Sequence, residues 1–174
     1  MLLRKAYEAT AAVLAEVTDW DAPSPCTEWT VREVANHLVA TLNTFAAVVE
    51  HTEWTMDGDH LGDDPHGAFR AAADRCVAAF DRPGALTDLH PFPFGPTPGS
   101  AIAAISMSET VVHGWDIATG AGVPYVPAPD VVEEVLAHAD EFKPPAEGMF
   151  GPPVPVAFDA PALTRLLART GRTA

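Results

Sequence analysis

The sequence is organised around a helical stretch with three ionisable side chains, Ser106-Met107-Ser108-Glu109-Thr110-Val111-Val112-His113-Gly114-Trp115-Asp116-Ile117. A step of four residues turns an α-helix through about 400°, so Glu109 and His113 lie one above the other, with Asp116 beside them. Ile102, Ile105 and Ile117 lie within roughly a quarter turn of the direction of Glu109 and His113, which indicates that this face packs inward. An ionised carboxylate in an apolar interior costs several kcal/mol unless it is paired, hydrogen-bonded or bound to a cation. We therefore expect either a buried polar network or half of a metal site.

Length and composition predict a single domain over residues 1–174, because the chain is 174 residues long and 48% hydrophobic. The net charge of −14 repels nucleic-acid phosphates and anionic lipid, which argues against nucleic-acid and membrane partners. The N-terminus becomes polar too early for a signal peptide, and no apolar window is long enough to span a bilayer. We expect a cytoplasmic protein, and the sequence leaves open whether it forms a homodimer.

The two cysteines, Cys26 and Cys76, are far apart in the sequence and form no Cys-x-x-Cys pair. In a reducing compartment such cysteines are usually free and behave as small hydrophobic residues. We expect two free, buried thiols.

The spacing of apolar residues predicts four long helices, over residues 3–17, 30–49, 68–80 and 100–119, and two shorter ones over 130–142 and 160–169. The clearest helix start is at Thr30, because Glu33 lies at the position that completes a capping box. Strand-like alternation is nowhere sustained. The predicted fold class is therefore all-α, an up-and-down four-helix bundle with short extra helices.

The connection over residues 83–99 is rich in proline and glycine, so it is expected to form a long loop without regular structure. Ordered loops of this length are often active-site lids. We expect this loop to shield the site.

The candidate chemistry combines His37 with Glu109 and His113. His37 lies near Thr41 on the edge of the apolar stripe of its predicted helix, and facing side chains of a bundle core are where such folds build metal sites. Two imidazoles and one carboxylate suit a divalent first-row ion, and three ligands leave one position open. Asp116 would orient a ligand imidazole from behind. The spacing alone also fits a hydrogen-bonded pair, and a lone histidine beside an apolar stripe is more often a core residue.

Other polar residues receive weaker predictions. Four lie close enough in the predicted helices to support the site: Asn36, Thr41, Ser106 and Thr110. The remaining histidines fall in loops or on predicted outer faces, where we expect no role: His51, His60, His66, His90 and His138. Of these, His90 is the most interesting because it lies in the predicted shielding loop.

Two motifs together resemble a known family: Pro25-Cys26-Thr27-Glu28-Trp29-Thr30-Val31 followed by Ala35-Asn36-His37-Leu38, and Glu109-x-x-x-His113-Gly114-Trp115-Asp116-Ile117-Ala118. With the tail over residues 159–172, they resemble the actinobacterial DinB/YfiT-like proteins related to the N-terminal domain of mycothiol-dependent maleylpyruvate isomerase. The resemblance implies a DinB-like four-helix bundle with metal ligands His37, Glu109 and His113. Zinc is the expected ion, with nickel as the alternative, and mycothiol or a similar thiol is the expected cosubstrate.

The leading hypothesis is a metal-dependent thiol S-transferase or isomerase that acts on a small electrophile. A metal-dependent hydrolase is the second hypothesis, and a non-catalytic metal-binding or interaction protein that retains the site is the third. The isomerase that the chain resembles has a further C-terminal domain with no counterpart in this sequence. The resemblance therefore does not carry over the isomerase activity, the substrate or a set of catalytic residues.

Overall fold

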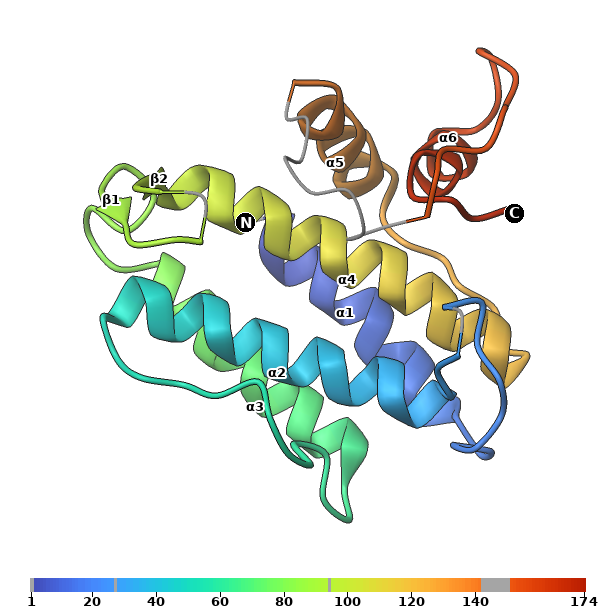
Figure 1. Ribbon diagram of the computed structural model, residues 1–174, viewed down its shortest axis with the longest axis horizontal. Helices are drawn as coiled ribbons and strands as arrows, with labels where there is room; N and C mark the ends of the chain where they lie inside the picture. Colours follow the sequence, from blue (N-terminus) through green and yellow to red (C-terminus); the bar gives the residue numbers. More distant parts are fainter. Residues whose placement is uncertain (1, 27, 94, 142–150) are drawn as a thin grey trace.

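The computed structural model describes residues 2–26, 28–93, 95–141 and 151–174 (Figure 1). The bundle consists of four long helices: α1 (Leu2–Glu16), α2 (Val31–Glu50), α3 (Pro65–Phe80) and α4 (Gly99–Ala121). Two shorter helices, α5 (Pro129–Glu141) and α6 (Ala162–Arg169), follow; α5 packs on α4 and α1, and α6 packs on α5. The described strands are the antiparallel pair β1 (Leu89–His90) and β2 (Thr97–Pro98). The predicted all-α four-helix bundle with short extra helices is confirmed.

The order of helix directions differs from a simple alternation. Helices α2 and α3 run in the same direction, because Arg32 at the start of α2 bonds to Gly62, just before α3, while Glu50 at the end of α2 pairs with Arg75 late in α3. The segment over residues 51–64 makes this possible, since it returns along the length of the bundle before α3 begins (Figure 1). Bundles with long crossover connections have such an order. Helix α2 lies beside α4 and antiparallel to it, because Gly120 near the end of α4 lies against Val31 at the start of α2. Helix α3 is antiparallel to α1, because Arg4 pairs with Asp74 whereas Tyr7 contacts Phe69.

Local signals explain where the helices begin and end. Thr30 forms the predicted capping box with Glu33, whose side chain accepts a hydrogen bond from the Thr30 N–H (2.7 Å). Helix α3 begins at Pro65, three residues earlier than predicted, because Asp64 caps it and proline fits the first helical position. Helix α4 continues beyond the predicted stop, and Gly122, in the left-handed conformation, caps it.

The hydrophobic core lies between the four long helices. The largest side chains that are fully buried come from all four: Leu14, Leu38, Leu42, Phe69, Phe80 and Ile102. Each contributes roughly 1.5–3 kcal/mol through the apolar surface that it removes from water. No helix of the described residues combines the length and hydropathy that a bilayer crossing requires.

The proline- and glycine-rich loop predicted over residues 83–99 folds back as the β1–β2 pair and packs on the C-terminal half of α2. Its Phe92 stacks on Phe45, about two helical turns beyond His37. His90 is buried, contrary to the expected outer position; its Nε2 donates a hydrogen bond to the carbonyl of Ala85 (2.8 Å). The Phe92–Phe45 contact attaches the loop to the far part of α2, and the His90–Ala85 bond holds the loop to itself.

Candidate metal centre

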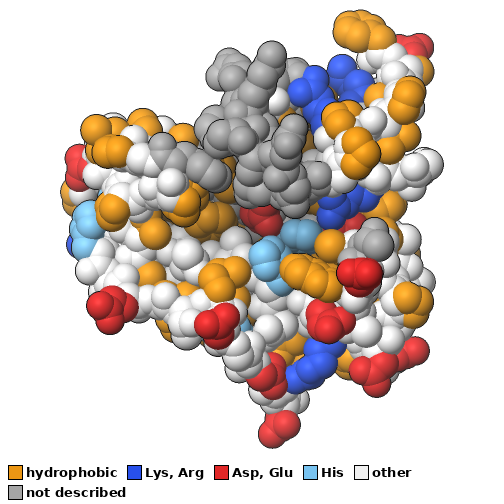
Figure 2. All heavy atoms as spheres, in the orientation of Figure 1, with side chains coloured by type: hydrophobic (Ala, Val, Ile, Leu, Met, Phe, Trp, Pro, Cys, Tyr) orange, Lys and Arg blue, Asp and Glu red, His pale blue; other side chains and the backbone are white. Residues whose placement is uncertain are grey.

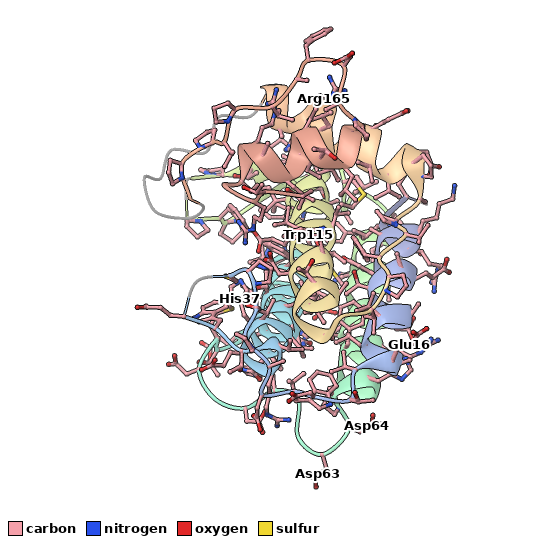
Figure 3. The ribbon with its side chains drawn as sticks, turned by 90° about the vertical axis from the view of Figure 1, so that its right-hand side faces the viewer. Glu16, His37, Asp63, Asp64, Trp115 and Arg165 are labelled. Carbon is pink, nitrogen blue, oxygen red and sulfur yellow. The ribbon has the colours of Figure 1, made fainter. Side chains whose placement is uncertain are left out.

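Helices α2 and α4 bring together the three residues predicted to share an ion. The Nε2 atom of His37 lies 3.6 Å from Oε2 of Glu109, and Nε2 of His113 lies 3.3 Å from the same oxygen. The three ligand atoms all lie within 4.8 Å of one another. Figure 3 shows His37 on α2 beside the middle of α4, far from Asp63 and Asp64 at the end of the crossover segment. The antiparallel helix pair thus unites side chains that are distant in the sequence.

The cluster is buried on the α4 side and open on the α2 side. Glu109 and His113 are buried, whereas the His37 side chain is 29% exposed. Figure 2 shows histidine side chains at the surface in the middle of this face, with acidic and basic side chains along one edge. The cluster therefore meets solvent through His37.

The charges in the cluster stabilise one another. Burial alone would raise the pKa of Glu109, but hydrogen bonds and charge from His113 and His37 outweigh it and lower that pKa to about 2. Burial would lower the pKa of His113, but hydrogen bonds to Asp116 and Glu109 raise it to about 9. At neutral pH Glu109 is therefore an anion paired with a protonated His113, and a metal ion that binds here would take the place of the His113 proton that faces Glu109.

Asp116 lies behind His113, as predicted, and a residue that sequence reasoning missed holds it there. Its Oδ2 is 2.9 Å from Nδ1 of His113, and Asp116 is fully buried. Arg172, from the C-terminal tail, donates from Nε to Oδ1 (3.2 Å) and from Nη2 to Oδ2 (2.8 Å). His113 and Asp116 are three residues apart on one helix, so their contact could be predicted from the sequence, whereas no local pattern links them to Arg172.

The connection before α2 forms another wall that the sequence did not reveal. The Trp29 ring lies 5.1 Å from the His37 ring, centre to centre. The Cys26 thiol is half-buried, not buried as predicted, and lies within 4.8 Å of ligand atoms of His113 and Asp116. Cys26 and Trp29, from the connection before α2, therefore line the site, which the sequence did not predict.

Two sets of side chains have donor atoms close enough for an ion, and they fit unequally. In the set of Cys26, His113 and Asp116, the carboxylate is already paired with a guanidinium, and that positive charge disfavours a second cation. In the set of His37, Glu109 and His113, two imidazole nitrogens face one carboxylate oxygen. Two histidines and one glutamate form a ligand set used by catalytic zinc. The second set is the one that fits a metal.

Of the polar residues that were weaker candidates, one contacts the site and others have structural contacts elsewhere. Thr41 lies at the site, with its Oγ1 3.4 Å from Nε2 of His37. Asn36 instead fastens the crossover segment, accepting from the N–H of His60 (2.6 Å). Thr110 donates to the backbone of Ser106 in its own helix.

Comparison with known proteins identifies the family of the chain. Residues 3–118 match the family described as the mycothiol maleylpyruvate isomerase N-terminal domain. The chain belongs to this family. The match contains all three residues of the candidate ligand set, and it agrees with the predicted DinB-like bundle. It ends before Arg172.

Two relatives are uncharacterized proteins of Mycobacterium tuberculosis, Rv0738 of strain H37Rv and MT0763 of strain CDC 1551. Each is 27% identical to this chain over 183 aligned positions, which cover 99% of this chain and 97% of the relative. No solved structure matches the chain.

Proposed function

We propose that the protein is a metal-dependent enzyme that uses a low-molecular-weight thiol, of the mycothiol type, to attack a small electrophilic substrate. The observation that carries the proposal is the convergence of His37, Glu109 and His113 on one half-open cluster. Membership in a family named for a mycothiol-dependent isomerase supports the choice of thiol.

The proposed roles follow from the contacts. His37 and His113 would bind the ion, zinc or alternatively nickel, through Nε2, and Glu109 would bind it through a carboxylate oxygen and supply negative charge. Asp116 would hold the His113 ring through Nδ1, so that Nε2 faces the ion. When bound, such an ion lowers the pKa of a coordinating thiol, so that the thiol is deprotonated near neutral pH.

The thiolate sulfur would form a bond to the electrophilic carbon. In an S-transferase reaction, the leaving group departs with its electron pair and the thioether is the product. In an isomerase reaction, the sulfur would add to one carbon of a double bond conjugated to a carbonyl, and the π electron pair would move onto the carbonyl oxygen. After rotation about the resulting single bond, the pair would return, the carbon–sulfur bond would break, and the thiolate would be released unchanged. Trp29, whose ring lies against that of His37, would restrict the space available to the substrate.

The first test measures the ion. Protein purified without an affinity tag is analysed for metals and titrated with zinc and nickel, beside His37→Ala and the control His66→Ala on α3. We expect about one equivalent of saturable binding in the wild type and in the control, and a large loss in His37→Ala. A wild type without saturable binding would contradict the proposal.

The second test measures the thiol. Cobalt-loaded protein in a Cys26→Ser background, which lacks the nearby protein thiol, is mixed with mycothiol or with S-methylated mycothiol. We expect a sulfur-to-cobalt charge-transfer band only with the free thiol. Turnover of ester or amide substrates without any thiol, and no such band, would favour a hydrolase instead.

A further inference from the structure

We propose that Arg172 is a positioning residue of the metal centre: it fixes the Asp116 carboxylate, and that carboxylate fixes the ring of His113. The inference rests on the proposed metal site. It assigns a role to a residue outside the family match, which ends at residue 118.

The contact between Arg172 and Asp116 is a bidentate guanidinium–carboxylate pair. Two guanidinium nitrogens donate to the two carboxylate oxygens, at 3.2 Å and 2.8 Å. Asp116 is 0% exposed and Arg172 is 9% exposed, so water does not compete strongly for these bonds. A planar two-point contact fixes the plane of a carboxylate as well as its place, which a lysine does not do.

The same carboxylate oxygen links Arg172 to His113. Oδ2 of Asp116 lies 2.8 Å from Nη2 of Arg172 and 2.9 Å from Nδ1 of His113. With Nδ1–H donated to Asp116, the Nε2 of His113 is the nitrogen left to face Glu109 and an ion. A displaced carboxylate would therefore turn the ring of a ligand.

The backbone after α6 delivers the guanidinium to this position. The N–H of Arg172 bonds to the carbonyl of Leu167 (2.9 Å), and that of Gly171 bonds to Ala168 (3.2 Å), which closes the helix end. Gly171 has φ +82°, and a Cβ there would meet the backbone of Gly151 at 2.9 Å. The Nη1 of Arg172 also donates to the carbonyl of Thr170 (2.6 Å). The turn thus holds the side chain in one orientation.

A double-mutant cycle separates positioning from general damage to the fold. Zinc affinity is measured by competition with a chromophoric chelator for the wild type, Arg172→Gln, Asp116→Asn and the double variant. We expect each single variant to weaken binding about 10–100-fold, the range for residues that orient metal ligands. We expect the double variant to be no weaker than the weaker single one, because both changes break the same linkage.

The matched control is Arg165→Gln, an arginine of α6 that bonds to the carbonyl of Phe158 and lies away from His37 (Figure 3). It should bind zinc like the wild type. In Arg172→Ala, millimolar ethylguanidinium should restore part of the affinity, and it should not do so when Asp116 is Asn. If Arg172→Gln does not fold, Arg172→Lys keeps the charge without the bidentate contact and should still bind zinc more weakly.

The proposal fails if the wild type binds zinc and the Arg172 variants bind it equally well, or if the two losses simply add. Failure of the wild type to bind zinc would instead contradict the proposed function.

Discussion

Helix α4 contributes to two buried polar clusters, and they differ in charge: the groups of one stay neutral, and those of the other are ionised. The hydroxyl–thiol cluster consists of Tyr7, Cys76 and Ser106, with the Tyr7 hydroxyl 3.1 Å from the Cys76 sulfur and 2.7 Å from the Ser106 hydroxyl. The α2–α4 cluster consists of His37, Glu109 and His113. The first is closed among α1, α3 and α4, and the second reaches solvent through His37.

Burial acts on the two clusters in opposite ways. In the hydroxyl–thiol cluster, burial raises the pKa of Tyr7 well above its usual value and that of Cys76 to about 11, so both groups stay neutral. In the α2–α4 cluster, opposite charges override burial and keep Glu109 ionised. A buried polar residue on a helix is therefore not by itself a sign of function. An ionised cluster with access to solvent is suited to bind a cation, and a neutral closed cluster is suited to packing.

The largest expected effect is the loss of zinc affinity when the carboxylate is removed from the α2–α4 cluster. Glu109→Gln should weaken zinc binding by more than about 100-fold, because a direct ligand matters more than the orienting residues, whose loss costs 10–100-fold. Calorimetric titration checks it. The control Glu50→Gln removes a carboxylate that pairs with Arg75 and should bind zinc normally. Equal affinities for the two variants would contradict the distinction between the clusters.

The next effect is the stabilisation that an ion provides. At a free zinc concentration of 100 times Kd, binding to the folded state alone adds about 2.7 kcal/mol to the free energy of unfolding. For a domain of this size, the melting temperature should rise by roughly 5–10 °C. A chelator should reverse the shift, and Glu109→Gln should not show it. A shift that persists in Glu109→Gln would place the ion elsewhere.

A smaller effect concerns the hydroxyl–thiol cluster at alkaline pH. The pKa of Cys76 rises from 9.0 to about 11 on folding, so its stabilising contribution is complete below pH 9 and is lost as the pH rises through 11. At pH 10 the loss amounts to about 1.4 kcal/mol. Denaturant unfolding should show that the wild type loses more stability than Cys76→Ala between pH 8 and pH 10. Parallel losses would indicate that Cys76 ionises as easily in the folded protein as in the unfolded chain.

The smallest effect is the loss of one hydroxyl from the same cluster. Tyr7→Phe should lower the free energy of unfolding by about 1 kcal/mol, because Cys76 and Ser106 lie 3.9 Å apart and still contact each other. Zinc affinity should not change. A tenfold loss of zinc affinity in this variant would show that the two clusters are coupled through α4.

Local patterns in the sequence predicted the parts of the site that lie on one helix. The four-residue step between Glu109 and His113 and the three-residue step to Asp116 follow from helix geometry alone. The capping box at Thr30 and Glu33 predicted where α2 begins. The choice of His37 rested on bundle geometry and on family resemblance, because nothing in its own helix distinguishes it from a core histidine.

The parts that could not be predicted depend on contacts between distant segments. The parallel course of α2 and α3 depends on how the segment over residues 51–64 returns along the bundle, which helix periodicity does not encode. Arg172 reaches Asp116 only because α5 and α6 pack back onto the bundle. Cys26 was read as a small hydrophobe, and only the three-dimensional path of its loop places it beside His113.

The pairing of α2 with α4 has a further consequence for the way the chain comes apart. Residues 37 and 109 are separated by all of α3 and both of its flanking loops. An ion bound by residues of both helices would act as a reversible cross-link that closes this long loop. The two helices could then separate only after one ligand had dissociated from the ion. Amide hydrogens in the facing turns of these two helices should then exchange more slowly in the loaded protein, while those of α6 change little.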